Sequence, residues 1–266
     1  MSARSSLLTV LGEFVLNTGA EVWTSTLVES LGLLGFGEQN ARQATARLLE
    51  QGTLDRAAHG RRTRWSLTES GRQLLTDGER RIYAFLGEPE PWDGRWLLVL
   101  SSLPDSQRAS RHQLRRRLGF LGFGSLTPGV MVSPHTGRER QAGAVLEALD
   151  LDSSAFLLRA QSTALAPPDR LIATAWDLPA LADRYKVFVE RFESERPTNP
   201  AETFVALTEL VDTWRRFPFA DPEIPPELLG DGWSGTAARS CFDDCHRRWN
   251  DAARAWFAEQ ERVSSQ

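Results

Sequence analysis

The sequence predicts an α+β protein built of three parts. Three observations lead to this fold class: an N-terminal series of helices that ends in a basic hairpin, a central alternation of strands and helices, and a helical remainder. With 266 residues, of which 41% are hydrophobic, the chain can bury a core of the corresponding size. We place the parts at residues 1–86, 87–175 and 176–266, with a Pro- and Gly-containing connection at 86–94.

Composition excludes several classes of protein. A charged fraction of 25% and a net charge of −4 are ordinary for a globular chain, which argues against disorder. No apolar run is long enough to span a membrane, and the N-terminus lacks the apolar block of a signal peptide. Two cysteines cannot form a disulfide scaffold. We therefore expect a cytoplasmic protein with no membrane partner.

The N-terminal part begins with three predicted helices. Apolar residues recur at helical spacing between Leu7 and Val15, and the segment 17–19 ends that helix. A short extended piece at 22–23 precedes a second helix that reaches Leu33. A glycine-containing turn leads to a third helix from about Glu38 to Gln51, and Gly52 is placed to terminate it.

The third helix has two different faces. Small and apolar residues, among them Ala41, Ala44 and Leu48, predict a packing face. The opposite face carries amide and guanidinium groups, which make paired hydrogen bonds to adenine and guanine edges in the major groove. These candidate DNA-binding residues are Gln39, Asn40, Arg42, Gln43 and Arg47. The alternative is a solvated helix face without a ligand.

A basic hairpin follows the third helix. Residues 53–57 and 62–67 read as two strands joined by a turn at 58–61, and a further helix runs from Glu69 to about Phe85. Three helices followed by such a hairpin is the order of a winged helix-turn-helix. Its wing would meet phosphates or the minor groove through Arg61, Arg62 and Arg64. A surface hairpin without a ligand is the alternative.

The central part predicts the order βαββαβ of a ferredoxin-like unit. The strands are placed at 95–103, 122–126, 129–133 and 154–160, and the helices at 106–118 and 138–149. Beyond this unit, apolar residues at helical spacing predict helices at 178–195, 200–216 and 237–259. The last two are separated by a proline-rich, irregular stretch at 217–235.

The sequence offers no catalytic or metal-binding pattern. It has neither a phosphate-binding loop nor a nucleophile elbow. The central unit resembles the small ferredoxin-like nucleases of CRISPR adaptation systems, which carry a metal-binding aspartate near the end of the first strand. Here that position is a serine, and Asp105 is displaced onto the turn. Cys241, Cys245 and His246 lack a second pair of ligands, so helix packing explains them better than a metal. We expect no enzyme activity and no cofactor.

A small-molecule site is predicted at the junction of the second and third parts. Trp92, Arg95 and Trp96 offer apolar walls beside a cation, although the two tryptophans could equally pack a domain interface. The helix at 108–117 is rich in arginine, and its nearest candidates for binding phosphate are Arg108, Arg111 and Arg115. A solvated face or a contact to the DNA backbone are the alternatives for this helix.

Motifs along nearly the whole chain resemble the PaaX-type repressors of phenylacetic acid catabolism. The pattern at 7–16 and the wing at 60–68 are common to winged helices, and the helix at 40–48 resembles the recognition helix of the family. The more specific ones are Trp92-Asp93-Gly94-Arg95-Trp96, the strand pair 121–124 with 129–134, and the late segments 216–222 and 225–229. This resemblance implies a homodimeric repressor that leaves its operator DNA when it binds phenylacetyl-CoA. The alternatives are a CoA-thioester-binding enzyme and an effector-free DNA-binding adaptor.

Overall fold

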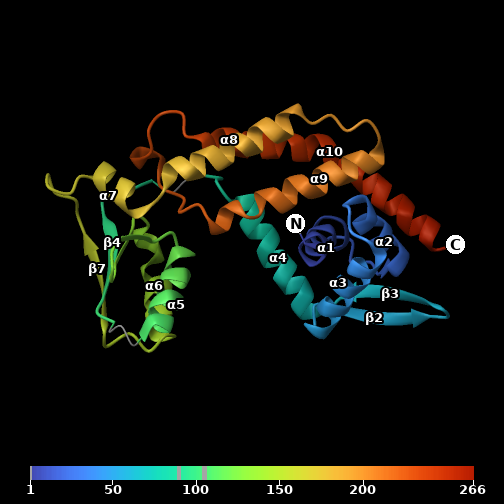
Figure 1. Cartoon of the computed structure of the whole chain (residues 1–266), viewed down its shortest axis with the longest axis horizontal. Coiled ribbons are helices and arrows are strands. Elements are labelled where there is room, and N and C mark those ends of the chain that lie inside the picture. The colour runs from blue at the N-terminus through green and yellow to red at the C-terminus, as the bar shows by residue number, and fades with distance from the viewer. Residues whose placement is uncertain (1, 89–90, 104–106) are drawn as a thin grey trace. The chain divides into compact units, whose positions relative to one another are not determined.

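The structure is a computed structural model that describes residues 2–88, 91–103 and 107–266. The chain forms an α+β fold with two antiparallel sheets and divides into two compact units (Figure 1). The first unit comprises Met1–Phe85, Phe188–Arg216 and Ala238–Gln266, and the second comprises Leu86–Val187 and Phe217–Ala237. The C-terminal helical region is thus shared between the two units.

The first unit begins with the elements that were expected to read DNA. Its helices are α1 (Ala3–Val10), α2 (Thr24–Leu33), α3 (Glu38–Glu50) and α4 (Glu69–Ala84). Its strands β1 (Val22–Trp23), β2 (Leu54–His59) and β3 (Arg62–Leu67) form one antiparallel sheet in the order β1-β3-β2. Helix α1 packs against α2, α3 and α9, so the N-terminal helices share their core with the C-terminal region.

Two local details of this unit differ from the sequence expectation. The first helix reaches Val15 as expected, but its last part, Leu11–Val15, is a π-helical segment, η1. Ala58 and His59, expected in the turn, belong to β2, where they pair with Thr63 and Arg62. The hairpin turn is therefore only two residues long. Gly60 in that turn has φ +62°, a conformation that glycine adopts without strain.

The start of α4 illustrates how closely this unit is packed. The side chain of Thr68 accepts a hydrogen bond from the backbone N–H of Gly71 at 2.9 Å and so caps the helix. A Cβ atom at Gly71 would lie 2.0 Å from the carbonyl oxygen of Thr53, which is backbone and cannot turn away.

We expect Gly71→Ala to lower the free energy of unfolding by about 1–3 kcal/mol, because the methyl group forces the helix away from the strand. Gly78→Ala is the matched control, because nothing lies within 4 Å of a Cβ at this position of the same helix. Urea unfolding of both variants measures the difference. Equal stability of the two variants would contradict this packing.

The second unit contains a four-stranded antiparallel sheet. Strands β4 (Trp96–Ser101), β5 (Gly124–Thr127), β6 (Val130–Ser133) and β7 (Ala155–Ala160) lie in the order β5-β6-β4-β7. Helices α5 (Arg108–Gly119) and α6 (Glu139–Glu147) cover one face and share a core with Leu97 and Val99. On the other face, Ile172 of α7 (Pro168–Ala175) and Ile224 pack against Trp96 and Val132.

The sequence did not predict α7, but it located the other elements of this unit to within a few residues. The expected helix start at Ser106, and Pro104 and Asp105 after the first strand, lie outside the described residues. The C-terminal helices α8 (Leu178–Ser194) and α9 (Pro200–Trp214) lie within two residues of the predicted ranges. Helix α10 (Ser234–Ser264) begins three residues before and ends five residues beyond the range predicted for it. Of the helices within the described ranges, none combines the length and the apolarity needed to cross a membrane.

Candidate nucleic-acid interface

Helix α3 presents a polar face and an apolar face, as its sequence indicates. Ala41, Ala44 and Leu48 are buried, together with Thr45, and they fix the helix against α1 and α2. The five candidate DNA-binding residues of the opposite face, Gln39, Asn40, Arg42, Gln43 and Arg47, are all exposed. Arg42 forms an ion pair with Glu38, one turn earlier, at 2.7 Å. The exposed face can therefore offer amide and guanidinium groups to a base edge without disturbing the core.

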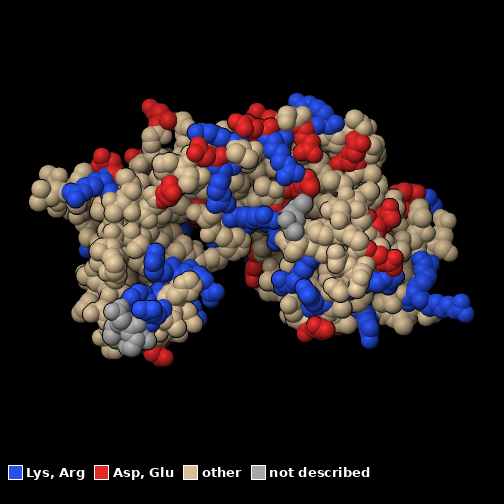
Figure 2. All heavy atoms as spheres, viewed as in Figure 1, with Lys and Arg blue, Asp and Glu red and all other residues tan. Residues whose placement is uncertain are grey.

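The β2–β3 hairpin carries two exposed arginines at its tip. Arg61 lies in the turn and Arg62 begins β3, and Figure 2 shows basic side chains gathered at this end of the hairpin. The guanidinium carbon of Arg62 lies 4.2 Å from the centre of the Trp23 ring, which is the geometry of a cation–π contact. The hairpin thus has a cationic tip, and an aromatic residue of β1 supports one of its charges.

Arg64 occupies a different environment from its two neighbours. It also stacks on Trp23, at 4.6 Å, but its side chain is only 28% exposed and lies between Glu21 at 3.5 Å and Glu261 at 3.6 Å. These carboxylates compensate its charge within the protein. The role of Arg64 in binding DNA stays a prediction, and the structure gives it a supporting position at the base of the hairpin.

The last turn of α10 and the residue after it contact β1 and the start of α2, beside this hairpin, and sequence reasoning missed these contacts. The backbone N–H of Trp23 donates to Glu261 at 2.7 Å, and its indole N–H donates to the hydroxyl of Ser265 at 2.9 Å. A third bond joins Ser25 to Ser264 at 2.8 Å. These partners are separated by more than 230 residues, and no local sequence pattern reveals them. The acidic C-terminal region therefore braces the candidate DNA-binding elements.

The residues proposed for the small-molecule site do not form one cluster. Trp96 is 1% exposed and belongs to the core of the second unit, with its indole N–H bonded to Ser162 at 2.8 Å. Trp92 packs against Trp96 with ring centres 5.5 Å apart, and its indole N–H donates to the carbonyl oxygen of Arg95. The side chain of Arg95 is exposed. Both tryptophans therefore belong to a core cluster of the second unit.

The three arginines of α5 also have separate surroundings. Arg111 donates to the carbonyl oxygen of Leu103 at 2.8 Å, which ties it to the segment after β4. Arg108 and Arg115 are exposed. Of the three, only Arg115 lines a large pocket of the second unit, together with Arg116 and Arg117. Figure 2 shows basic side chains gathered around α5.

Comparison with known proteins gives matches along the whole chain. Three family models match in order: the PaaX-like protein at residues 2–71, the PaaX protein central Cas2-like domain at 89–172, and the PaaX-like protein C-terminal domain at 176–259. The transcriptional repressor PaaX of Escherichia coli (strain K12) is 29% identical, with 99% of this chain and 85% of that protein covered. The chain belongs to the PaaX family.

A solved structure adds a likeness of fold to this membership. The uncharacterized protein Rv0674 from Mycobacterium tuberculosis superposes with a TM-score of 0.66 over 100% of this chain and 99% of that one, at 23% identity. The N-terminal PaaX model contains α1 to β3 and so includes every candidate DNA-binding residue. The C-terminal PaaX model ends at residue 259, just before the Glu261 that holds the hairpin. The curated relative is a repressor by name, in agreement with the expectation of a regulator rather than an enzyme.

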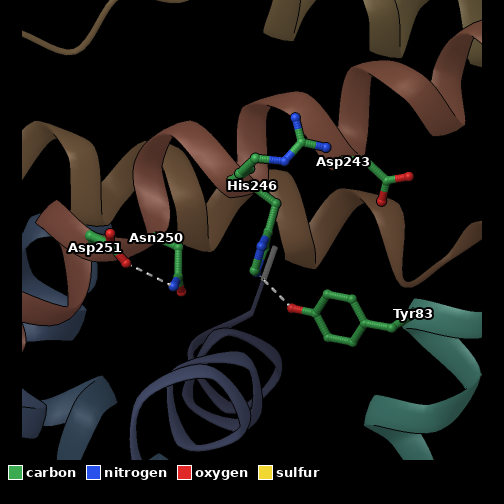
Figure 3. A pocket seen from close by; sticks show the side chains of 6 residues that line it. Tyr83, Asp243, His246, Asn250 and Asp251 are labelled. Atoms are coloured by element: carbon green, nitrogen blue, oxygen red, sulfur yellow. Dashed lines mark hydrogen bonds between the residues drawn. The ribbon is translucent and has the colours of Figure 1, made fainter.

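In this PaaX-family chain a partly buried polar cluster joins η1, α4 and α10. The hydroxyl of Tyr83 lies 2.8 Å from Nε2 of His246 (Figure 3). The same hydroxyl donates to Glu13 at 2.7 Å, and Nε2 of His246 lies 3.2 Å from Glu13. Burial first, and then the Glu13 carboxylate, raise the pKa of Tyr83, so that the hydroxyl keeps its proton. Because that proton is directed to Glu13, His246 acts as the donor through Nε2.

Helix α10 also carries the two cysteines that the sequence analysis considered together with His246. Cys241 and Cys245 are free and buried, and Cys245 lies 3.6 Å from the carbonyl oxygen of Phe192. His246 instead contacts Glu13 and Tyr83 and lines a pocket of about 400 Å³ (Figure 3). Within the described ranges, no three His, Cys, Asp or Glu residues gather in a way that could hold a metal ion. Packing accounts for both cysteines.

Proposed function

We propose that this chain is a DNA-binding transcriptional repressor whose first 86 residues work as a winged helix-turn-helix. Helix α3 enters the major groove and reads bases through its exposed Gln, Asn and Arg side chains, while the hairpin tip holds the backbone or the minor groove. The observation that carries the proposal is the exposed polar face of α3 beside a cationic hairpin that β1 and α10 support. The repressor named among its relatives agrees with it.

The proposal extends to assembly and regulation. One short helix specifies only a few base pairs, so a homodimer in the cytoplasm would read two half-sites of an operator. The second part, 87–175, serves as a ferredoxin-like scaffold, and the third, 176–266, connects it to the DNA-binding part. An aryl- or acyl-CoA thioester, from an aromatic-acid pathway such as phenylacetate degradation, releases the repressor. A coupling free energy of about 1–3 kcal/mol between binding of the operator DNA and binding of the thioester would suffice for this response.

The experiment that tests this function is a fluorescence-anisotropy titration of the DNA upstream of the chain's own gene. It is run at fixed salt with and without a panel of acyl-CoA thioesters. Specific binding that one thioester releases is the expected result. Specific binding that is indifferent to every thioester would favour the effector-free adaptor, and absence of specific binding would contradict the repressor.

Arg62→Ala should weaken binding to every DNA sequence and reduce the salt dependence of the association constant. Loss of one phosphate contact lowers the slope of log K against log salt by about 1. Arg80→Ala is the control, because Arg80 is an exposed arginine of α4 that lies outside the candidate interface. Titrations at several salt concentrations measure both slopes. An unchanged affinity and slope in Arg62→Ala would reject the assignment of the hairpin as a wing.

A further inference from the structure

The second unit contains a pocket of about 910 Å³ that is large enough for an extended organic ligand. One side is formed by the C-terminal end of α5 and the loop that follows it, and another by α6. The remaining wall comes from Trp176 and from the segment 219–222, which belongs to the stretch that the sequence had presented only as irregular.

The wall at 219–222 is fixed by specific contacts. The carbonyl oxygen of Pro222 lies 2.9 Å from Nε2 of His135, and Arg138 pairs with the adjacent Glu223 at 2.8 Å. Gly122, in the loop after α5, has φ +80°, and a Cβ atom there would lie 2.7 Å from the same Pro222 carbonyl. The pocket is therefore a built feature of this unit, with its segments locked to one another.

The charged residues that line this pocket are all positive. Arg115, Arg116 and Arg117 line it and are exposed, whereas its lining includes no aspartate or glutamate. In the described part of the chain, none of these three guanidinium groups has a carboxylate within ion-pair distance. Guanidinium groups bind phosphate through two parallel hydrogen bonds. The rim of the pocket thus provides cations that an anionic ligand can neutralise.

The interior is apolar and includes two exposed aromatic rings. Phe120 is 46% and Phe219 is 64% exposed, and their ring centres lie 5.7 Å apart. Leu121, Phe123 and Val145 complete the apolar surface. Aromatic side chains that remain this exposed beside a cationic rim suit a ligand with both an apolar and an anionic part.

The geometry points to this pocket as the site of the effector, with the phosphates of an amphipathic anion at Arg115–Arg117 and its apolar group against Phe120 and Phe219. The inference rests on the proposed function, since it assumes that a small molecule controls DNA binding. It moves the site away from Trp92 and Trp96, whose packing in the core leaves them no role in this pocket. Of the six residues that the sequence suggested, it retains Arg115 alone.

Isothermal titration of the full chain with three probes tests the assignment. Phenylacetyl-CoA carries both chemical halves, free CoA carries the phosphates alone, and phenylacetate carries the aromatic group alone. We expect phenylacetyl-CoA to bind most tightly. Arg116→Glu should weaken the binding of both phenylacetyl-CoA and CoA by about tenfold or more. Phe219→Ala should weaken only the binding of the thioester, by about tenfold.

Two control variants match the test variants in chemistry and exposure. Arg108→Glu changes an exposed arginine of the same helix that does not line the pocket, and Phe156→Ala removes a phenylalanine that is 66% exposed on β7. Both controls should keep the affinity of the wild-type chain for the thioester. Far-UV circular dichroism checks that all four variants are folded.

The results separate a failure of this site from a failure of the proposed function. The pocket assignment would be overturned if all four variants bound the thioester equally, or if the wild-type chain did not bind it. Loss of thioester binding in Trp92→Ala alone would also overturn it. Operator binding by the ligand-free wild-type chain is measured separately and reports on the repressor itself. The assignment requires that the thioester releases the operator from both controls at the wild-type concentration, whereas Phe219→Ala needs about tenfold more thioester.

Discussion

Asp212→Asn should lower the free energy of unfolding by about 3 kcal/mol at pH 7, the largest stability effect that we expect for a single side chain. The carboxylate of Asp212 is completely buried in α9 and pairs with Arg215 at 2.9 Å and Arg216 at 2.6 Å. It also accepts hydrogen bonds from the hydroxyls of Ser5 at 2.9 Å and Thr9 at 3.3 Å, both on α1. An amide cannot satisfy this set of donors, because it brings two N–H groups of its own.

Asp244→Asn is the matched control for this substitution. Asp244 forms the same i,i+3 pair with an arginine, Arg247, at 3.0 Å, but its side chain is 61% exposed. Exposed ion pairs contribute at most about 1 kcal/mol to stability. The free energy of unfolding of this variant, measured in urea, should therefore be close to that of the wild-type chain. Equal effects of the two substitutions would show that the buried cluster does not join α1 to α9 in the way that its geometry indicates.

The contribution of Asp212 should also depend on pH in a defined direction. Burial alone would raise the pKa of this carboxyl, but the Arg215 charge, the hydrogen bonds from Arg215 and Ser5, and the Arg216 charge outweigh it and lower the pKa below the usual value. A lowered pKa in the folded state means that the stabilisation is complete above the unfolded-state pKa, which is about 3.9. It is lost as pH falls through the folded-state pKa. The difference in stability between wild type and Asp212→Asn should therefore narrow below about pH 4.

The double variant Gln43→Ala/Arg47→Ala should weaken binding to the specific operator by about 100-fold, the largest effect that we expect on DNA recognition. Both side chains are exposed on α3 and lie one turn apart, on the face opposite the buried Ala44 and Leu48. Each paired contact to a base edge contributes about 1–3 kcal/mol of discrimination. Binding to unrelated DNA should fall much less, because the hairpin arginines keep their contacts to the backbone.

Anisotropy titrations of operator and unrelated DNA at one salt concentration measure this loss of specificity. The control is Gln73→Ala/Arg80→Ala, which removes the same two kinds of side chain from exposed positions on α4. It should leave both affinities unchanged. If the α3 variant keeps its preference for the operator, then α3 is a solvated face and another element reads the sequence.

The faces of α3 could be predicted because they follow from local spacing alone. Alanine and leucine recur every three to four residues, and tertiary structure buries the side that this period indicates. The same reasoning found the hairpin, since Arg62 and Arg64 alternate with Thr63 and so share a face of β3. It could not show that Arg64 meets Glu261, because that pair depends on how distant helices pack.

The effector site could not be derived from the sequence for a related reason. Trp96 looked available beside Arg95, yet its position on a central strand buries it between two layers. Phe219 lies in a proline-rich stretch without periodicity. Tertiary contacts, among them the bond between His135 and Pro222 and the contact between Phe120 and Phe219, bring that stretch to the end of α5. The sequence analysis made no assignment for helix α7, which is only eight residues long and starts at a proline.

The stacking of Arg62 and Arg64 on Trp23 has a thermodynamic consequence. A free arginine side chain carries about 2 kcal/mol of rotamer entropy, much of which is lost when the guanidinium is fixed on a phosphate. On this hairpin the indole of Trp23, whose N–H donates to Ser265, already restricts both guanidinium planes in the unbound protein. These two arginine side chains therefore lose part of their rotamer entropy during folding rather than on binding DNA. In the proposed complex with DNA, Glu261 and Ser265 would thereby lower the entropic cost of association through their hydrogen bonds to Trp23.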